Sequence, residues 1–82
     1  MTLRLQPVQV ATGSDEDGML IFDEHRLVAV LVRLSGVHED LGVAGQWFLE
    51  TGYGPLDVRD NPTFADLVAA EAWVKQRLAR RA

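Results

Sequence analysis

Residues 27–34, Leu-Val-Ala-Val-Leu-Val-Arg-Leu, decide the fold of this 82-residue chain. Seven of the eight are apolar and three are valines, which is typical of a strand with apolar side chains on both sides of its sheet. Because side chains alternate between the two sides of a strand, the segment divides into two sets. They are Val28, Val30, Val32 and Leu34 on one side, and Leu27, Ala29, Leu31 and Arg33 on the other. We expect the first, wholly apolar set to pack under a helix.

Three other segments are predicted to be strands of the same sheet, at residues 3–10, 19–22 and 46–51. Their alternating or aromatic side chains favour extended structure. A polar link at residues 23–26 joins the second of them to residues 27–34 as an antiparallel hairpin. Pro7 has no backbone donor, so we expect its strand at an edge of the sheet, with a bulge or bend at the proline.

One amphipathic helix is predicted at residues 67–80, where neither glycine nor proline occurs. Asp66 is placed to cap it, since a carboxylate can accept hydrogen bonds from the free amides of the first turn. Glu71 and Lys75 have the spacing of a favourable pair along a helix. The apolar stripe is formed by Leu67, Ala70, Val74 and Leu78, flanked by Trp73. The predicted fold is therefore α+β: an antiparallel four-stranded β-meander with one C-terminal amphipathic α-helix packed on one face, in a single domain over residues 1–82.

A single helix can cover only one side of such a sheet. The side that we expect to stay open carries Leu27, Ala29, Leu31 and Phe48. Covering about 400 Å² on each of two subunits, at ~25 cal/mol per Å², gives roughly 20 kcal/mol, against a cost of association of about 4–15 kcal/mol. We therefore expect a homodimer through these residues. The alternative is that residues 35–45, an irregular segment with three glycines, fold back over this side.

Composition and charge argue against several classes of function. A net charge of −4 disfavours general nucleic-acid binding, which needs clustered Lys and Arg. The absence of cysteine excludes disulfides, thiolate nucleophiles and cysteine-based metal sites. The longest apolar run is far shorter than the ~20 residues that span a bilayer, and the N-terminal residues lack the apolar core of a signal peptide, so we expect a cytoplasmic protein with no membrane contact. Seven arginines against a single lysine indicate a bacterial, GC-rich coding sequence.

Residues with catalytic or metal-binding chemistry are few. His25 and His38 each lie beside carboxylates, but neither has a recognised ligand spacing. Ser14 and Ser35 are the only serines, and neither lies in a Gly-x-Ser-x-Gly turn. We therefore predict no catalytic residues, no metal and no cofactor. An enzyme remains the third alternative, with His38, Glu39 and Tyr53 as the residues to test.

Three residues are candidates for binding, namely Trp47, Tyr53 and His38. Trp47 and Phe48 point to opposite sides of their strand, so they do not form one stacking platform. Tyr53 lies in a glycine-flanked turn and is the best single candidate for a functional contact. The sequence favours a non-enzymatic, homodimeric interaction or accessory module that engages a protein partner. The alternative is a small-molecule-binding domain with a pocket near residues 35–54.

Overall fold

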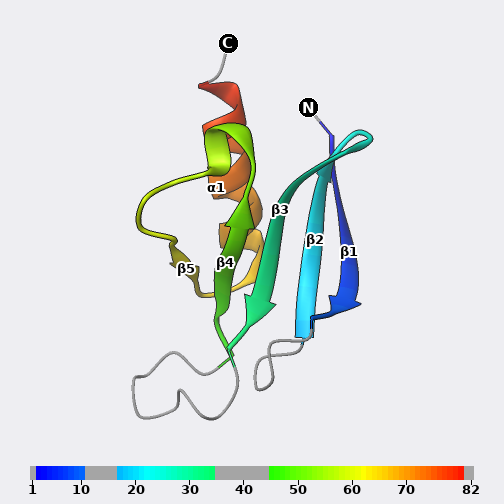
Figure 1. Cartoon of the computed structure of the whole chain (residues 1–82), viewed down its shortest axis with the longest axis vertical. Helices are drawn as coiled ribbons and strands as arrows, with labels where there is room; N and C mark the ends of the chain where they lie inside the picture. Colours follow the sequence, from blue (N-terminus) through cyan, green and yellow to red (C-terminus); the bar gives the residue numbers. More distant parts are fainter. Residues whose placement is uncertain (1, 11–16, 35–44, 81–82) are drawn as a thin grey trace.

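The computed structural model describes residues 2–10, 17–34 and 45–80 of the chain. Within these ranges, five antiparallel strands form one sheet in the order β1-β2-β3-β4-β5, so neighbours along the chain are neighbours in the sheet (Figure 1). The elements are β1 (Leu3–Gln9), β2 (Asp17–Asp23), β3 (Arg26–Arg33), β4 (Trp47–Gly52), the 3-10 helix η2 (Gly54–Leu56), β5 (Thr63–Phe64) and α1 (Leu67–Ala79). The predicted α+β meander with a C-terminal helix is confirmed. The sequence did not predict the short β5, which pairs with the start of β4.

Strand β1 lies at one edge of the sheet, as Pro7 predicts. The predicted bulge at Pro7 is wrong, because β1 pairs with β2 in one unbroken register from Leu3↔Asp23 to Gln9↔Asp17. The change of apolar phase along β1 has another cause. Leu5 packs against the hydrophobic core on one side of the sheet, whereas Val8, an odd number of residues away, points to the other side.

Two register shifts interrupt the central pairings. Between β2 and β3 the register changes from Ile21↔Ala29 to Phe22↔Leu27, which leaves Val28 as an extra residue in β3. Val28 is buried in the hydrophobic core together with the next residue, Ala29, whereas the preceding residue, Leu27, points to the other side of the sheet. Between β3 and β4 the extra residue is Glu50, which is exposed.

The predicted assignment of the two sides of β3 is wrong. Ala29 and Leu31 are fully buried in the core cluster that includes α1, so they lie beneath the helix and not on the open side. Val30 and Val32 lie on the opposite side of the sheet, outside that cluster. Helix α1 therefore leaves Val30 and Val32 of the wholly apolar set uncovered, whereas Val28 of that set joins the core.

Side-chain size explains which side the helix covers. Ala29 pairs with Gly52 across β3 and β4, which makes a shallow path over the sheet. A Cβ at Gly52 would overlap the Leu56 carbonyl, so the η2 backbone passes directly over this glycine. Leu56 is fully buried there. Valines in the same row would hold η2 and α1 away from the sheet.

Helix α1 follows the predicted pattern closely. Asp66 is the N-cap, and its carboxylate accepts a hydrogen bond of 2.8 Å from the Ala69 amide. The Glu71 and Lys75 side chains form an ion pair at 3.2 Å. The buried residues of the helix are Ala70, Val74 and Leu78, with Leu67 and Trp73 packed against the core beside them.

Arg77 fastens the last turns of α1 to η2. Its Nε donates a hydrogen bond of 3.2 Å to the Pro55 carbonyl, and its guanidinium lies 5.5 Å from the centre of the Trp73 ring. Trp73 in turn packs at 5.5 Å against Phe64 of β5 in a tilted arrangement. This one basic residue near the C-terminus therefore has a structural partner.

Candidate functional site

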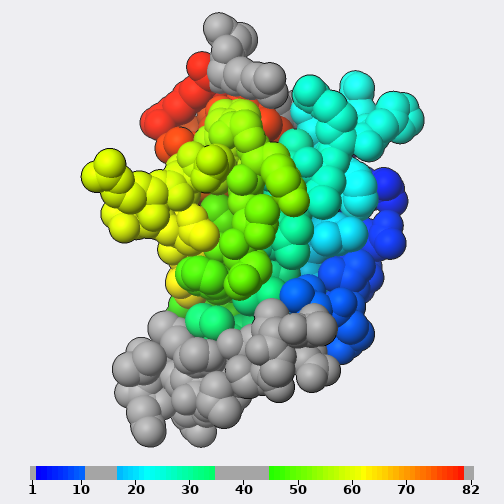
Figure 2. Space-filling view, in the orientation of Figure 1, coloured from blue at the N-terminus to red at the C-terminus, as the bar shows by residue number. Residues whose placement is uncertain are grey.

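The side of the sheet turned away from α1 is the outer face, formed by the central strands and β4. Register places Leu20 opposite Val30, Phe22 opposite Leu27, and Val32 opposite Phe48. None of these six residues belongs to the core cluster or packs against it, although Val32 is only 2% exposed. Figure 2 shows strands β1 to β4 as the surface toward the viewer, with α1 behind the sheet in Figure 1.

Polar residues border the outer face along both edges of the sheet. Arg4 and Gln6 lie on β1, opposite Phe22 and Leu20. On the other edge, Thr51 of β4 lies opposite Val30, and Thr63 of β5 lies opposite Phe48. An apolar centre with a polar border is the composition of a protein–protein interface.

Arg4 connects this border to the apolar centre. Its guanidinium carbon lies 4.4 Å from the centre of the Phe22 ring, and its Nη1 donates to Gln6 Oε1 at 3.2 Å. The charge is therefore held over an aromatic ring at one corner of the outer face.

Glycine at position 18 shapes the same surface. Gly18 pairs with Val8 on one side and Val32 on the other. A Cβ at this position would lie 3.2 Å from both the Val8 methyl and the Leu31 carbonyl. The Val8 and Val10 side chains therefore occupy the space that a side chain at position 18 would need.

The predicted dimer residues divide between the two sides of the sheet. Leu27 and Phe48 lie on the outer face and are half-buried. Ala29 and Leu31 have no exposed surface, because α1, η2 and their strand neighbours cover them. The other apolar residues of the outer face are Leu20, Phe22, Val30 and Val32. Alternation along the strand could have found Val30 and Val32, once small side chains are used to choose the side under the helix.

The two predicted binding residues with described positions do not share a site. Trp47 begins β4 and Tyr53 follows its end, so the strand separates them. Tyr53 is 49% exposed and lines a hollow of about 220 Å³ with Arg26, Pro55 and Leu78. Trp47 is half-buried and lines a hollow of about 500 Å³ near the opposite end of the sheet. His38, the third candidate, lies outside the described residues.

The candidate catalytic residues form no constellation in the described part of the chain. His25 is exposed in the turn between β2 and β3. Ser14, Ser35 and Glu39 lie outside the described residues. In the ranges that the structure describes, no group of three or more His, Cys, Asp or Glu side chains is arranged to hold a metal ion. No helix within those ranges is long and apolar enough to cross a membrane.

Comparison with known proteins found no match to a family model, to a curated protein or to a solved structure.

Proposed function

We propose that this chain is a non-enzymatic interaction module of the bacterial cytoplasm, and that it acts as a homodimer through the outer face of its sheet. The observation that supports this most directly is the apolar centre of that face, bordered by polar residues on β1, β4 and β5. An apolar patch of this kind on a small domain is characteristic of an interaction site. A second copy of the chain carries the same face, so packing of the two faces against each other covers both apolar centres.

Strand-to-strand pairing through the free edge of β1 is a less favourable way for two chains to associate. The Thr2 carbonyl accepts from the Glu24 amide at 3.4 Å, so the backbone of Thr2 faces β2. The backbone amide and carbonyl groups of successive residues point alternately to the two sides of a strand. Those of Arg4, Gln6 and Val8 therefore also point toward β2, whereas the backbone of Pro7 points to the free edge. Proline there offers no donor to an incoming strand. This favours packing of one sheet face on another.

The area of the outer face suits a weak dimer. Four strands about 4.8 Å apart and about 23 Å long give a footprint of roughly 450 Å² per subunit. Two subunits then bury about 900 Å², which is near the lower limit for specific interfaces. The dimer is therefore expected to dissociate on dilution, with a dissociation constant on the order of micromolar.

Charge placement is compatible with a second copy on this face. Arg4 lies at a corner, where β1 approaches the hairpin that joins β2 to β3. A twofold axis lying between the two sheets, either along or across the strands, carries Arg4 to a different corner of the partner. The two guanidinium groups therefore do not face each other, and the apolar centres coincide.

The test is the molar mass in solution, measured by sedimentation or light scattering up to about 100 μM. We expect a mass approaching that of two 9.1 kDa chains at the highest concentration and that of one on dilution. Leu20→Glu places a charge in the apolar centre and should give a monomer at every concentration. Gln6→Glu is the matched control, because it introduces the same charge in the same row of the sheet but at the border. Circular dichroism checks that both variants are folded.

A wild-type chain that stays monomeric at about 100 μM contradicts the proposal. So does a folded Leu20→Glu variant that dimerises as strongly as Gln6→Glu, because the interface would then lie elsewhere.

A further inference from the structure

A second surface lies on the helix side of the sheet, where α1 does not reach. Helix α1 packs over η2 and β5, toward the β4 edge, and leaves the ends of β1 and β2 uncovered. The hollow there measures about 500 Å³, within the range of small-molecule sites. Its lining includes Pro7, Met19, Trp47, Arg33, Asp17 and Gln9.

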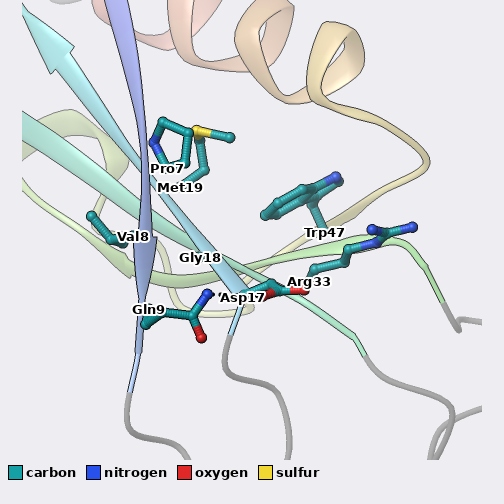
Figure 3. Close-up of a pocket in the computed structure, with 8 residues that line it drawn as sticks. All are labelled: Pro7, Val8, Gln9, Asp17, Gly18, Met19, Arg33 and Trp47. Atoms are coloured by element: carbon teal, nitrogen blue, oxygen red, sulfur yellow. Dashed lines mark hydrogen bonds between the residues drawn. The ribbon is translucent and has the colours of Figure 1, made fainter.

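Apolar side chains form two opposing walls of the hollow. Pro7 and Met19 are register partners on β1 and β2 and lie together, with Trp47 across from them (Figure 3). Trp47 also packs against the core, and its backbone pairs with Phe64 of β5. These contacts hold the indole in place. An indole, a thioether and a proline ring together suit a flat, apolar ring system.

Polar groups of opposite charge stand at two places on the rim. Arg33 is the register partner of Trp47, is exposed, and extends beside the indole (Figure 3). Asp17 accepts a hydrogen bond of 3.0 Å from the Gln9 side-chain amide, which holds that carboxylate at the ends of β1 and β2. An anionic group is thus favoured beside Arg33 and disfavoured beside Asp17. A guanidinium offers parallel N–H donors that match a carboxylate.

We infer that this hollow binds a small aromatic carboxylate, with the ring between Trp47 and Met19 and the carboxylate on Arg33. Val8 and Gly18 of the outer face also border the hollow, but Leu20, Phe22 and Val30 at the centre of the proposed dimer face do not line it.

Binding can be tested with naphthalene-2-carboxylate, using naphthalene-2-carboxamide as the uncharged probe with the same ring. Each is titrated to about 5 mM into the ¹⁵N-labelled chain while the two indole N–H signals are followed by NMR. A Trp73→Phe variant assigns the signals. We expect the carboxylate to shift the Trp47 signal saturably, and the carboxamide to bind about tenfold more weakly, because it lacks the ion pair.

Variants separate the proposed contact from general charge effects. Arg33→Gln should weaken carboxylate binding about tenfold and leave carboxamide binding unchanged. Arg59→Gln is the matched control, since it removes the same charge from an exposed residue outside the hollow. The Leu20→Glu variant should bind as the wild type does, which distinguishes this site from the dimer face.

Three results would overturn the inference. They are no change in the Trp47 signal with either probe, equal affinity for the two probes, and equal weakening by Arg33→Gln and Arg59→Gln.

Discussion

The two sides of the sheet carry comparable apolar side chains but are covered differently. On the helix side, Ile21, Leu31 and Leu49 have no exposed surface, because α1 and η2 lie over them. On the outer face, Leu20 and Val30 occupy equivalent places in the same strands and stay half-buried. The amount of apolar surface does not distinguish these sides. The row of small residues at Ala29 and Gly52 does, because it lets η2 approach the sheet backbone.

The largest expected effect comes from truncating a leucine on each side. Leu31→Ala should lower the free energy of unfolding by about 2–5 kcal/mol, since the cavity lies beneath α1 and cannot close. Leu20→Ala, the same change on the outer face of the neighbouring strand, should cost less than half as much in the monomer. Urea unfolding of both variants at one low protein concentration measures the difference. Equal losses would mean that the outer face is covered as completely as the helix side.

An intermediate effect is expected where η2 crosses β4. Gly52→Ala should destabilise the chain by about 1–3 kcal/mol, because the added methyl overlaps the Leu56 carbonyl and η2 must move outward. Thr51→Ala, one residue earlier and on the outer face, is the control and should have a smaller effect. Thermal unfolding measures both. If Gly52→Ala has no effect, small residues do not select the side that the helix covers.

The smallest effect concerns the start of the helix itself. Asp66→Ala should cost about 1 kcal/mol, because the Ala69 amide loses its acceptor. Asp66→Asn should retain most of the stability, since asparagine also caps helices. Asp60→Ala removes an exposed carboxylate outside the helix and serves as the control for charge. A loss in Asp60→Ala equal to that in Asp66→Ala would show that net charge, and not capping, is responsible.

Local signals in the sequence were sufficient for most of the fold. The spacing of Ala70, Val74 and Leu78 predicts the buried stripe of α1, and Asp66 predicts its first turn. Pro7 predicts an edge strand because its missing donor is a property of one residue. These features depend on neighbours within a turn or within one strand, so no tertiary information was needed.

The side of the sheet that the helix covers could not be predicted in this way. Both sides of β3 are apolar, so alternation identifies two sets, and the one clear difference between them, the charge of Arg33, favoured the wrong set. The deciding contact joins Leu56 to Gly52, the register partner of Ala29, and it depends on the path of a 3-10 helix that the sequence did not indicate. The register shift that adds Val28 to the core is likewise a pairing property. The sequence suggested Trp47 as a binding residue, but the contributions of Pro7, Met19 and Arg33 to the hollow could not be predicted, since they require knowing where α1 stops.

The chain has two tryptophans, Trp47 and Trp73, and both pack against the core on the helix side. Intrinsic fluorescence therefore reports the docking of α1 and is insensitive to events on the opposite side of the sheet. Trp73, held between Phe64 and the Arg77 guanidinium, should lose this environment as soon as the helix detaches. Emission and molar mass thus provide separate readouts of folding and assembly in a protein small enough for the two processes to be confused.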